Sequence, residues 1–129
     1  MEGSLGTKRV GGLLRDALRA LPVLIWAEHV RLRSSLHEAA HLSRKQGANC
    51  IKRSPERRLQ LRHIIARFDA YMPGGPNCLR RSLAEMAMDP DSARERLYAG
   101  LRSGGGVKSG HAWLESVPTP ERYDAVVTI

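Results

Sequence analysis

Apolar residues recur at helical spacing through most of the first 72 residues. The repeat predicts a helix over residues 10–21, and its apolar positions are Leu13, Leu14, Ala17, Leu18 and Leu21. Pro22 should break or kink this helix, because proline lacks an N–H and clashes with the preceding turn. The pattern resumes at Val23 and runs to about Lys45, and Gly47 is a typical C-terminal stop.

A further helix is predicted to begin at Ser54-Pro55, an N-cap residue followed by proline at the first helical position, and to run to about Tyr71. Its apolar residues share one side, and its arginines lie mostly on the other. The apolar set is Leu61, Ile64, Ile65 and Phe68, and the arginines are Arg57, Arg58, Arg62 and Arg67. We expect the arginine side to be solvated surface, or else a surface that docks a peptide or its carrier.

The pattern changes after residue 72. A Pro-Gly-Gly-Pro turn at 73–76 precedes a helix over 77–88, whose expected core stripe is Leu79, Leu83, Met86 and Ala87, with Arg80, Arg81 and Glu85 facing outward. Three strands are predicted at 97–102, 107–117 and 123–129. The predicted fold class is therefore α+β: a basic helical part over 1–72, then a core over 73–129 in which one helix packs on a small antiparallel sheet.

The net charge of +8 belongs to the first part of the chain. Residues 1–72 hold 14 Lys/Arg against 6 Asp/Glu, whereas residues 73–129 hold 7 of each. Such a field attracts acidic partners. The longest apolar run, residues 20–27, is too short to span a bilayer, and no signal-peptide pattern opens the chain. Cytoplasmic location without a membrane partner is the expectation, and Cys50 and Cys78 make no disulfide framework.

Candidate chemistry centres on Cys78, which follows the turn and Asn77, a residue that favours the N-cap position. A helix start presents unpaired N–H groups and partial positive charge, which favour the thiolate and can bind the oxyanion of an acyl-transfer intermediate. His111 is the candidate base and acid, and Asp124 the carboxylate that orients it. Cysteine on a helix start, histidine on a strand and carboxylate on the next strand is the order of a papain- or transglutaminase-like thiol site.

The strand pattern does not decide which carboxylate orients His111. His111, Trp113 and Glu115 share one face of their strand. If the second and third strands pair, Glu115 opposite Asp124 leaves Asp124 diagonally distant from His111, whereas His111 opposite Asp124 brings the two together. Glu115 is the poorer candidate, because four residues along a strand span about 13 Å.

The segments Pro-x-Cys-Leu-x-Arg-Ser-Leu-Ala and His-Ala-Trp-Leu-Glu, with a glycine-containing strand between them, resemble the lasso-peptide maturation protease. That family is transglutaminase-like and removes the leader peptide from a ribosomally made precursor. The resemblance implies Cys78 as nucleophile, His111 as general base and acid, and Asp124 as orienting carboxylate, with no cofactor and no metal. It also implies a precursor leader as substrate, a separate leader-recognition protein as partner, and a cyclase that closes the ring.

Two alternatives come from other classes. His37-Glu38-Ala39-Ala40-His41 is an HExxH motif on a predicted helix, as in zinc peptidases, and its third ligand would have to be Glu56 or His63. The second alternative is a non-catalytic basic module that binds a peptide or nucleic acid. Nucleic acid is the less favoured ligand, because aromatic residues are only 5% and no nucleic-acid motif is present.

Overall fold

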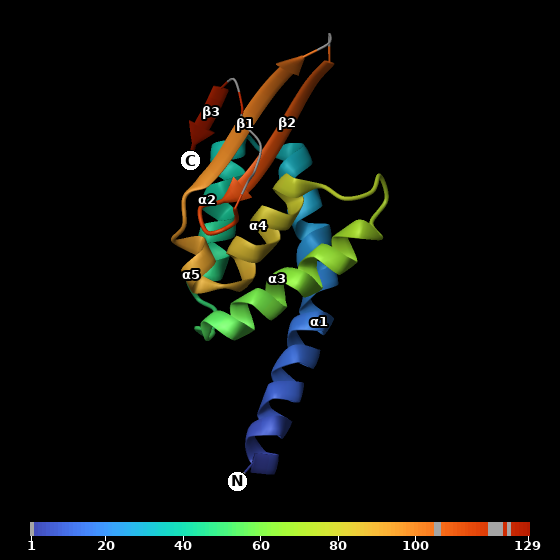
Figure 1. Ribbon diagram of the computed structural model, residues 1–129, viewed down its shortest axis with the longest axis vertical. Helices are drawn as coiled ribbons and strands as arrows, with labels where there is room; N and C mark the ends of the chain where they lie inside the picture. Colours follow the sequence, from blue (N-terminus) through green and yellow to red (C-terminus); the bar gives the residue numbers. More distant parts are fainter. Residues whose placement is uncertain (1, 105–106, 119–122, 124) are drawn as a thin grey trace.

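Helix α4 (Cys78–Met88) lies between the other helices and one face of a small antiparallel sheet (Figure 1). The computed structural model describes residues 2–104, 107–118, 123 and 125–129. Around α4 it describes α1 (Glu2–Arg33), α2 (Leu36–Gly47), α3 (Pro55–Ala70), α5 (Pro90–Ala93), β1 (Leu97–Gly104), β2 (Val107–Leu114) and β3 (Ala125–Thr128). The α+β prediction is confirmed at this level.

The sheet has the order β2-β1-β3, and both pairings are antiparallel. In the central strand Gly100 faces His111 of β2 on one side and Val126 of β3 on the other. The choice between Asp124 and Glu115 as the carboxylate that orients His111 assumed that the second and third strands pair. That assumption is wrong, because β3 returns to the far side of β1 and leaves β2 as an edge strand.

The first helix differs from the prediction at Pro22. Helix α1 continues through this proline, and the chain breaks instead at Ser34–Ser35. Ser35 is extended and its hydroxyl accepts a hydrogen bond from the Glu38 N–H at 3.2 Å, so it caps α2. The sequence carried this signal, since Ser-x-x-Glu is the pattern of a capping box.

The other predicted helix starts are confirmed. Ser54 caps α3, with its hydroxyl 3.2 Å from the Arg57 N–H and Pro55 at the first position. Asn77 caps α4, with its side-chain oxygen 2.9 Å from the Arg80 N–H. Both caps satisfy an amide that the helix leaves without a carbonyl partner, which fixes where each helix begins.

Two groups of buried side chains form the core. The first joins α1, α3 and α4 through residues such as Leu24, Leu61 and Leu83. The second joins α2 and α4 to the sheet through residues such as Met86, Leu97 and Leu114. Because α4 contributes to both groups, helices from residues 1–72 and the sheet from residues 73–129 pack on the same central helix.

Helix α4 buries charged residues that we expected to face outward. Arg80 is only 2% exposed and Glu85 only 5%, while Arg81 is partly exposed. Arg80 pairs with the buried Asp69 and with Glu28, and Glu85 pairs with Arg62. The prediction failed because a helix covered on all sides buries its polar positions as well, and these then need partners of opposite charge.

Three of the four arginines of α3 are bound to carboxylates of other segments, while Arg67 is exposed as we expected of a solvated face. Arg57 binds the buried Asp16 of α1, Arg58 binds Asp89, and Arg62 holds Glu85 with two hydrogen bonds of 2.7 and 2.9 Å. These three arginines therefore connect α3 to α1 and α4. Reversing their charge would unpair buried carboxylates, so it is no test of docking.

Among the described residues, no helix combines the length and the apolar character that crossing a membrane requires.

Candidate thiol site

The turn at residues 73–76 fixes the position at which helix α4 begins. Gly74 and Gly75 have φ values of 86° and 81°, a left-handed conformation that suits glycine. The Gly75 N–H donates to the Met72 carbonyl at 2.9 Å, and the Gly75 carbonyl accepts from Arg80 at 2.8 Å. Cys78 then stands as the first residue of α4, directly after the Asn77 cap.

A buried ion-pair network anchors this helix start. One carboxylate oxygen of Asp69 accepts from Arg80 Nε at 2.5 Å, and the other accepts from the Asn77 N–H at 2.8 Å and from Arg81 at 3.1 Å. Burial alone would lower the pKa of Arg80, but its hydrogen bonds to Asp69 and Glu28 raise it above the ordinary value. Asp69 thus fixes the residues on both sides of Cys78.

The sulfur of Cys78 accepts a hydrogen bond from the backbone N–H of Ala112 at 3.2 Å. Because β2 is an edge strand, this N–H is free of β1 and points out of the sheet toward α4. The other cysteine has the opposite arrangement: the Cys50 thiol donates to the carbonyls of Gln46 and Ala87, both at 3.5 Å. Cys78 is therefore a hydrogen-bond acceptor, whereas Cys50 is a donor.

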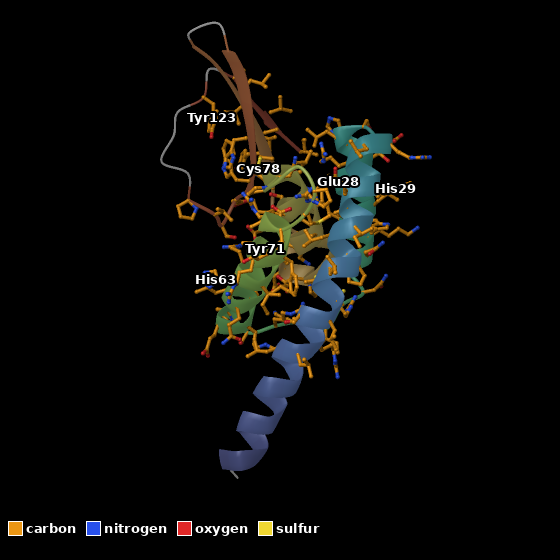
Figure 2. All side chains as sticks on the ribbon, turned by 90° about the vertical axis from the view of Figure 1, so that its right-hand side faces the viewer. Glu28, His29, His63, Tyr71, Cys78 and Tyr123 are labelled. Atoms are coloured by element: carbon orange, nitrogen blue, oxygen red, sulfur yellow. The ribbon has the colours of Figure 1, made fainter. Side chains whose placement is uncertain are left out.

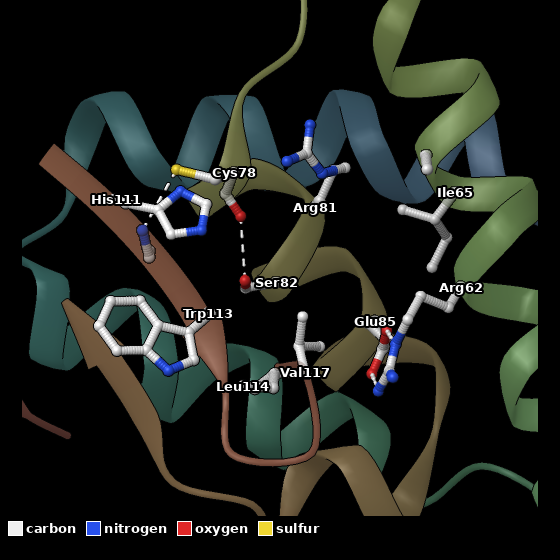
Figure 3. A pocket seen from close by; sticks show the side chains of 12 residues that line it. Arg62, Ile65, Cys78, Arg81, Ser82, Glu85, His111, Trp113, Leu114 and Val117 are labelled. Atoms are coloured by element: carbon white, nitrogen blue, oxygen red, sulfur yellow. Dashed lines mark hydrogen bonds and ion pairs between the residues drawn. The ribbon is translucent and has the colours of Figure 1, made fainter. Parts of the chain in front are cut away.

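Cys78 and His111 line the same two hollows. One, of about 110 Å³, extends toward Arg62 and Ser82, and the other, of about 270 Å³, extends toward Leu36 and Leu101. Figure 3 shows the imidazole beside the sulfur at the edge of β2. In β2 the side chain of His111 points to the face opposite to that of the buried Ala112. The imidazole and the Cys78 sulfur therefore meet at the edge of the strand and not inside the core.

Aromatic rings hold the imidazole of His111 on the outer face of the sheet. It stacks on Trp113 with ring centroids 5.6 Å apart and on Tyr123 at 6.1 Å, and Trp113 in turn stacks on Tyr123 at 5.2 Å. Figure 2 labels Tyr123 beside the strands and Cys78 where the sheet meets the helices. We had not assigned Tyr123 to the site.

Gly100 makes room for the Tyr123 ring. A Cβ atom on Gly100 would stand 2.5 Å from Cγ of Tyr123, closer than real Cβ contacts allow. A glycine inside a predicted strand is a signal of such close approach, so the sequence did carry a hint of this contact.

The third candidate, Asp124, lies outside the described residues. Glu115, its alternative, is exposed, and its carboxylate lies 3.5 Å from the Arg96 N–H. The backbone N–H of Glu115 donates to the Arg96 carbonyl at 3.0 Å, so the carboxylate and the backbone of Glu115 both lie beside the residue that precedes β1.

The HExxH residues His37, Glu38 and His41 are exposed on α2 and line a shallow hollow with Leu42. Within the part of the chain that the structure describes, no three His, Cys, Asp or Glu side chains gather as metal ligands would. Neither Glu56 nor His63, the third ligands considered above, completes a set with the two histidines.

Comparison of the chain with protein-family models, with curated proteins and with solved structures finds no match.

Proposed function

We propose that this protein is a cysteine peptidase with Cys78 as nucleophile and His111 as general base and acid. The observation that carries the proposal is the junction of sulfur and imidazole at one strand edge, with the Ala112 N–H bound to the sulfur. A half-buried thiol at a helix start, hydrogen-bonded as an acceptor and open to two hollows, is the environment in which a thiolate nucleophile is found.

Acylation would proceed by attack of Cys78 Sγ on the carbonyl carbon of the scissile amide. The thiol proton passes to the imidazole of His111, and a tetrahedral oxyanion forms. The rings of Trp113 and Tyr123 flank the imidazolium that results and hold it in place. Collapse of the intermediate breaks the C–N bond, and the imidazolium proton goes to the leaving amine.

The oxyanion needs donors at the start of α4. Among the described residues no acceptor takes up the N–H of Cys78, so it is a first donor. The side-chain oxygen of Asn77 is bound to the Arg80 N–H, which leaves the Asn77 amide nitrogen beside the larger hollow as a second donor. Water, deprotonated by His111, then attacks the thioester, releases the carboxylate and restores the thiol.

The substrate we propose is the leader segment of a ribosomally synthesised lasso precursor, on the resemblance of the Cys-Leu-x-Arg-Ser-Leu-Ala and His-Ala-Trp segments to the maturation protease. The two hollows on either side of the sulfur suit an extended chain that crosses the strand edge. In this proposal a separate protein delivers the leader. The helix and sheet that carry the site would form a transglutaminase-like core. Asp124 stays the proposed orienting carboxylate.

The test is mass analysis of a candidate precursor incubated with the protein. Cleavage should leave a free carboxylate on the leader, persist with a metal chelator present, and fall at least about a thousandfold in Cys78→Ala. Cys50→Ala is the matched control and should cleave at the normal rate. Cleavage retained by Cys78→Ala, with its helical circular dichroism intact, would remove Cys78 from the mechanism.

Thiol alkylation provides a test that needs no precursor. Iodoacetamide should modify Cys78 faster than Cys50 at neutral pH, and His111→Ala should slow only the Cys78 reaction. Peptide mapping by mass spectrometry gives both rates from one sample, with Cys50 as internal reference. Equal rates at the two cysteines would contradict an activated thiol at residue 78.

A further inference from the structure

Helix α1 carries a row of exposed apolar side chains that the fold does not use. Its members are 44–70% exposed and follow one another at intervals of four, three, four and seven residues; they are Leu14, Leu18, Leu21, Ile25 and Leu32. Alternation of three and four residues is the spacing of a coiled-coil seam, which presents one narrow ridge to another helix. The interval of seven skips Glu28, which instead binds Arg31 and Arg80.

The ridge lies on a different side of α1 from the core. The buried residues of this helix, such as Ala20, Leu24 and Ala27, pack against α3 and α4. Figure 1 shows the N-terminal half of α1 extending beyond the other helices, and Figure 2 shows the same in the turned view. A second helix could therefore lie along the ridge without displacing any described element.

A cationic hollow of about 420 Å³ lies on another side of α1, around the helix from the ridge. Arg15 and Arg19 of α1 line it together with Lys52. Asp16, the acidic residue of its wall, is buried and already bound by Arg53 and Arg57. In the described part of the chain, no carboxylate pairs with Arg15, Arg19 or Lys52. Arg15 and Arg19 directly follow the ridge residues Leu14 and Leu18 in α1, so two unpaired cations flank the ridge and Lys52 lies across the hollow from them.

We infer that α1 docks an acidic amphipathic helix of a partner protein, with apolar residues on the ridge and carboxylates over Arg15, Arg19 and Lys52. Charge complementarity selects this occupant, since the net charge of +8 belongs to residues 1–72. A second copy of the chain would bring arginine against arginine beside the seam. A lipid surface would favour a broad apolar face with basic residues on both sides, whereas this ridge is one side chain wide and basic on one side.

The experiment uses the full-length chain and a fluorescent synthetic peptide of four heptads, with leucine at a and d and glutamate at e and g. Its counterpart has lysine in place of every glutamate. Fluorescence anisotropy should show binding of the glutamate peptide only. Either Arg15→Glu with Arg19→Glu, or Leu18→Glu with Ile25→Glu, should weaken it at least about tenfold. Because all four residues are exposed, these variants should keep the circular dichroism of the parent chain.

Controls and contrary outcomes are defined by the same assay. Arg94→Glu with Leu42→Glu changes an exposed arginine and an exposed leucine elsewhere, and should bind as the parent does. Failure of the glutamate peptide to bind, or equal binding of both peptides, would overturn the inference. So would α1-dependent binding to anionic vesicles or to duplex DNA in place of the peptide, or a dimer in sedimentation that Leu18→Glu dissociates.

Discussion

At the scale of single residues, the two cysteines show how the same side chain acquires opposite hydrogen bonding. The Cys78 sulfur accepts an N–H from an edge strand, whereas the Cys50 thiol donates to two carbonyls. This difference in hydrogen bonding does not follow from composition. It follows from what the fold places around each sulfur, because a thiolate needs donors and a thiol can satisfy acceptors.

Gly100 gives a prediction at this scale. Gly100→Ala would place a Cβ against the Tyr123 ring, displace that ring from His111 and Trp113, and lower the cleavage rate more than the stability. The measurements are peptidase rate and near-ultraviolet circular dichroism, which reports the stacked aromatic rings.

Gly110→Ala is the matched control, because its new Cβ would meet its nearest neighbours, among them the Gly100 carbonyl, at an ordinary 3.7 Å. If Gly100→Ala leaves both the rate and the aromatic spectrum unchanged, Tyr123 has no part in holding the imidazole.

At the scale of elements, the start of α4 is fixed by an acid at the end of α3. Asp69 is buried and holds the Asn77 N–H, Arg80 and Arg81, so it sets both the position and the direction of the helix that carries Cys78. Arg80 extends this anchor to α1 through Glu28 and to the turn through the Gly75 carbonyl. The same network gives the core its charged residues and the site its geometry.

Asp69→Asn should therefore destabilise the fold by about 3 kcal/mol or more, because it leaves a buried arginine without its counter-charge. Urea unfolding followed by circular dichroism measures the effect, and Cys78 alkylation in the folded fraction measures the consequence for the site.

Asp91→Asn, a partly exposed carboxylate on α5, is the control and should change stability by less than about 0.5 kcal/mol. A loss of the same small size for Asp69→Asn would show that the anchor is dispensable.

At the scale of the whole molecule, the arginine-rich composition has two uses. Arg53, Arg57, Arg58 and Arg62 hold carboxylates between α1, α3 and α4, and so act as internal connections. Burial lowers the pKa of Arg58, but hydrogen bonds to Glu95 and Asp89 raise it above its ordinary value. Other arginines are exposed, among them Arg15 and Arg19 of α1, which lie near Lys52.

Stability should depend on pH through Glu28. Its hydrogen bonds with Arg31 and then with Arg80 hold the pKa of this carboxyl below its ordinary value, against the effect of burial. The folded state thus binds the proton more weakly than the unfolded chain. The stabilisation is present above the unfolded value of about 4.3 and is lost as pH falls through the lower folded value.

Glu28→Gln should cost about 1 kcal/mol at pH 7, and the difference from the parent chain should shrink toward pH 3. Urea unfolding at the two pH values measures it. Glu38→Gln, on the exposed side of α2, is the control. A Glu28→Gln deficit that stays constant down to pH 3 would show that the charge of Glu28 does not stabilise the fold.

Local patterns predicted much of the fold. The caps at Ser54 and Asn77, the glycine-proline turn and the three strands follow from rules that act within a few residues, and the structure has them. The break at Ser35 is also a local signal, since its capping box stands in the sequence, whereas Pro22, which we predict to break the helix, lies inside α1.

By itself the sequence determined the helix starts, the α+β class and the types of residue available for thiol chemistry, because hydrogen bonding at caps and turns and the spacing of apolar residues are local. Only the tertiary structure decided that β3 joins the far side of β1, that arginines point inward, and that Tyr123 covers Gly100 beside His111. These depend on which surfaces meet across long stretches of chain, where burial and charge pairing outweigh the preference of any single position.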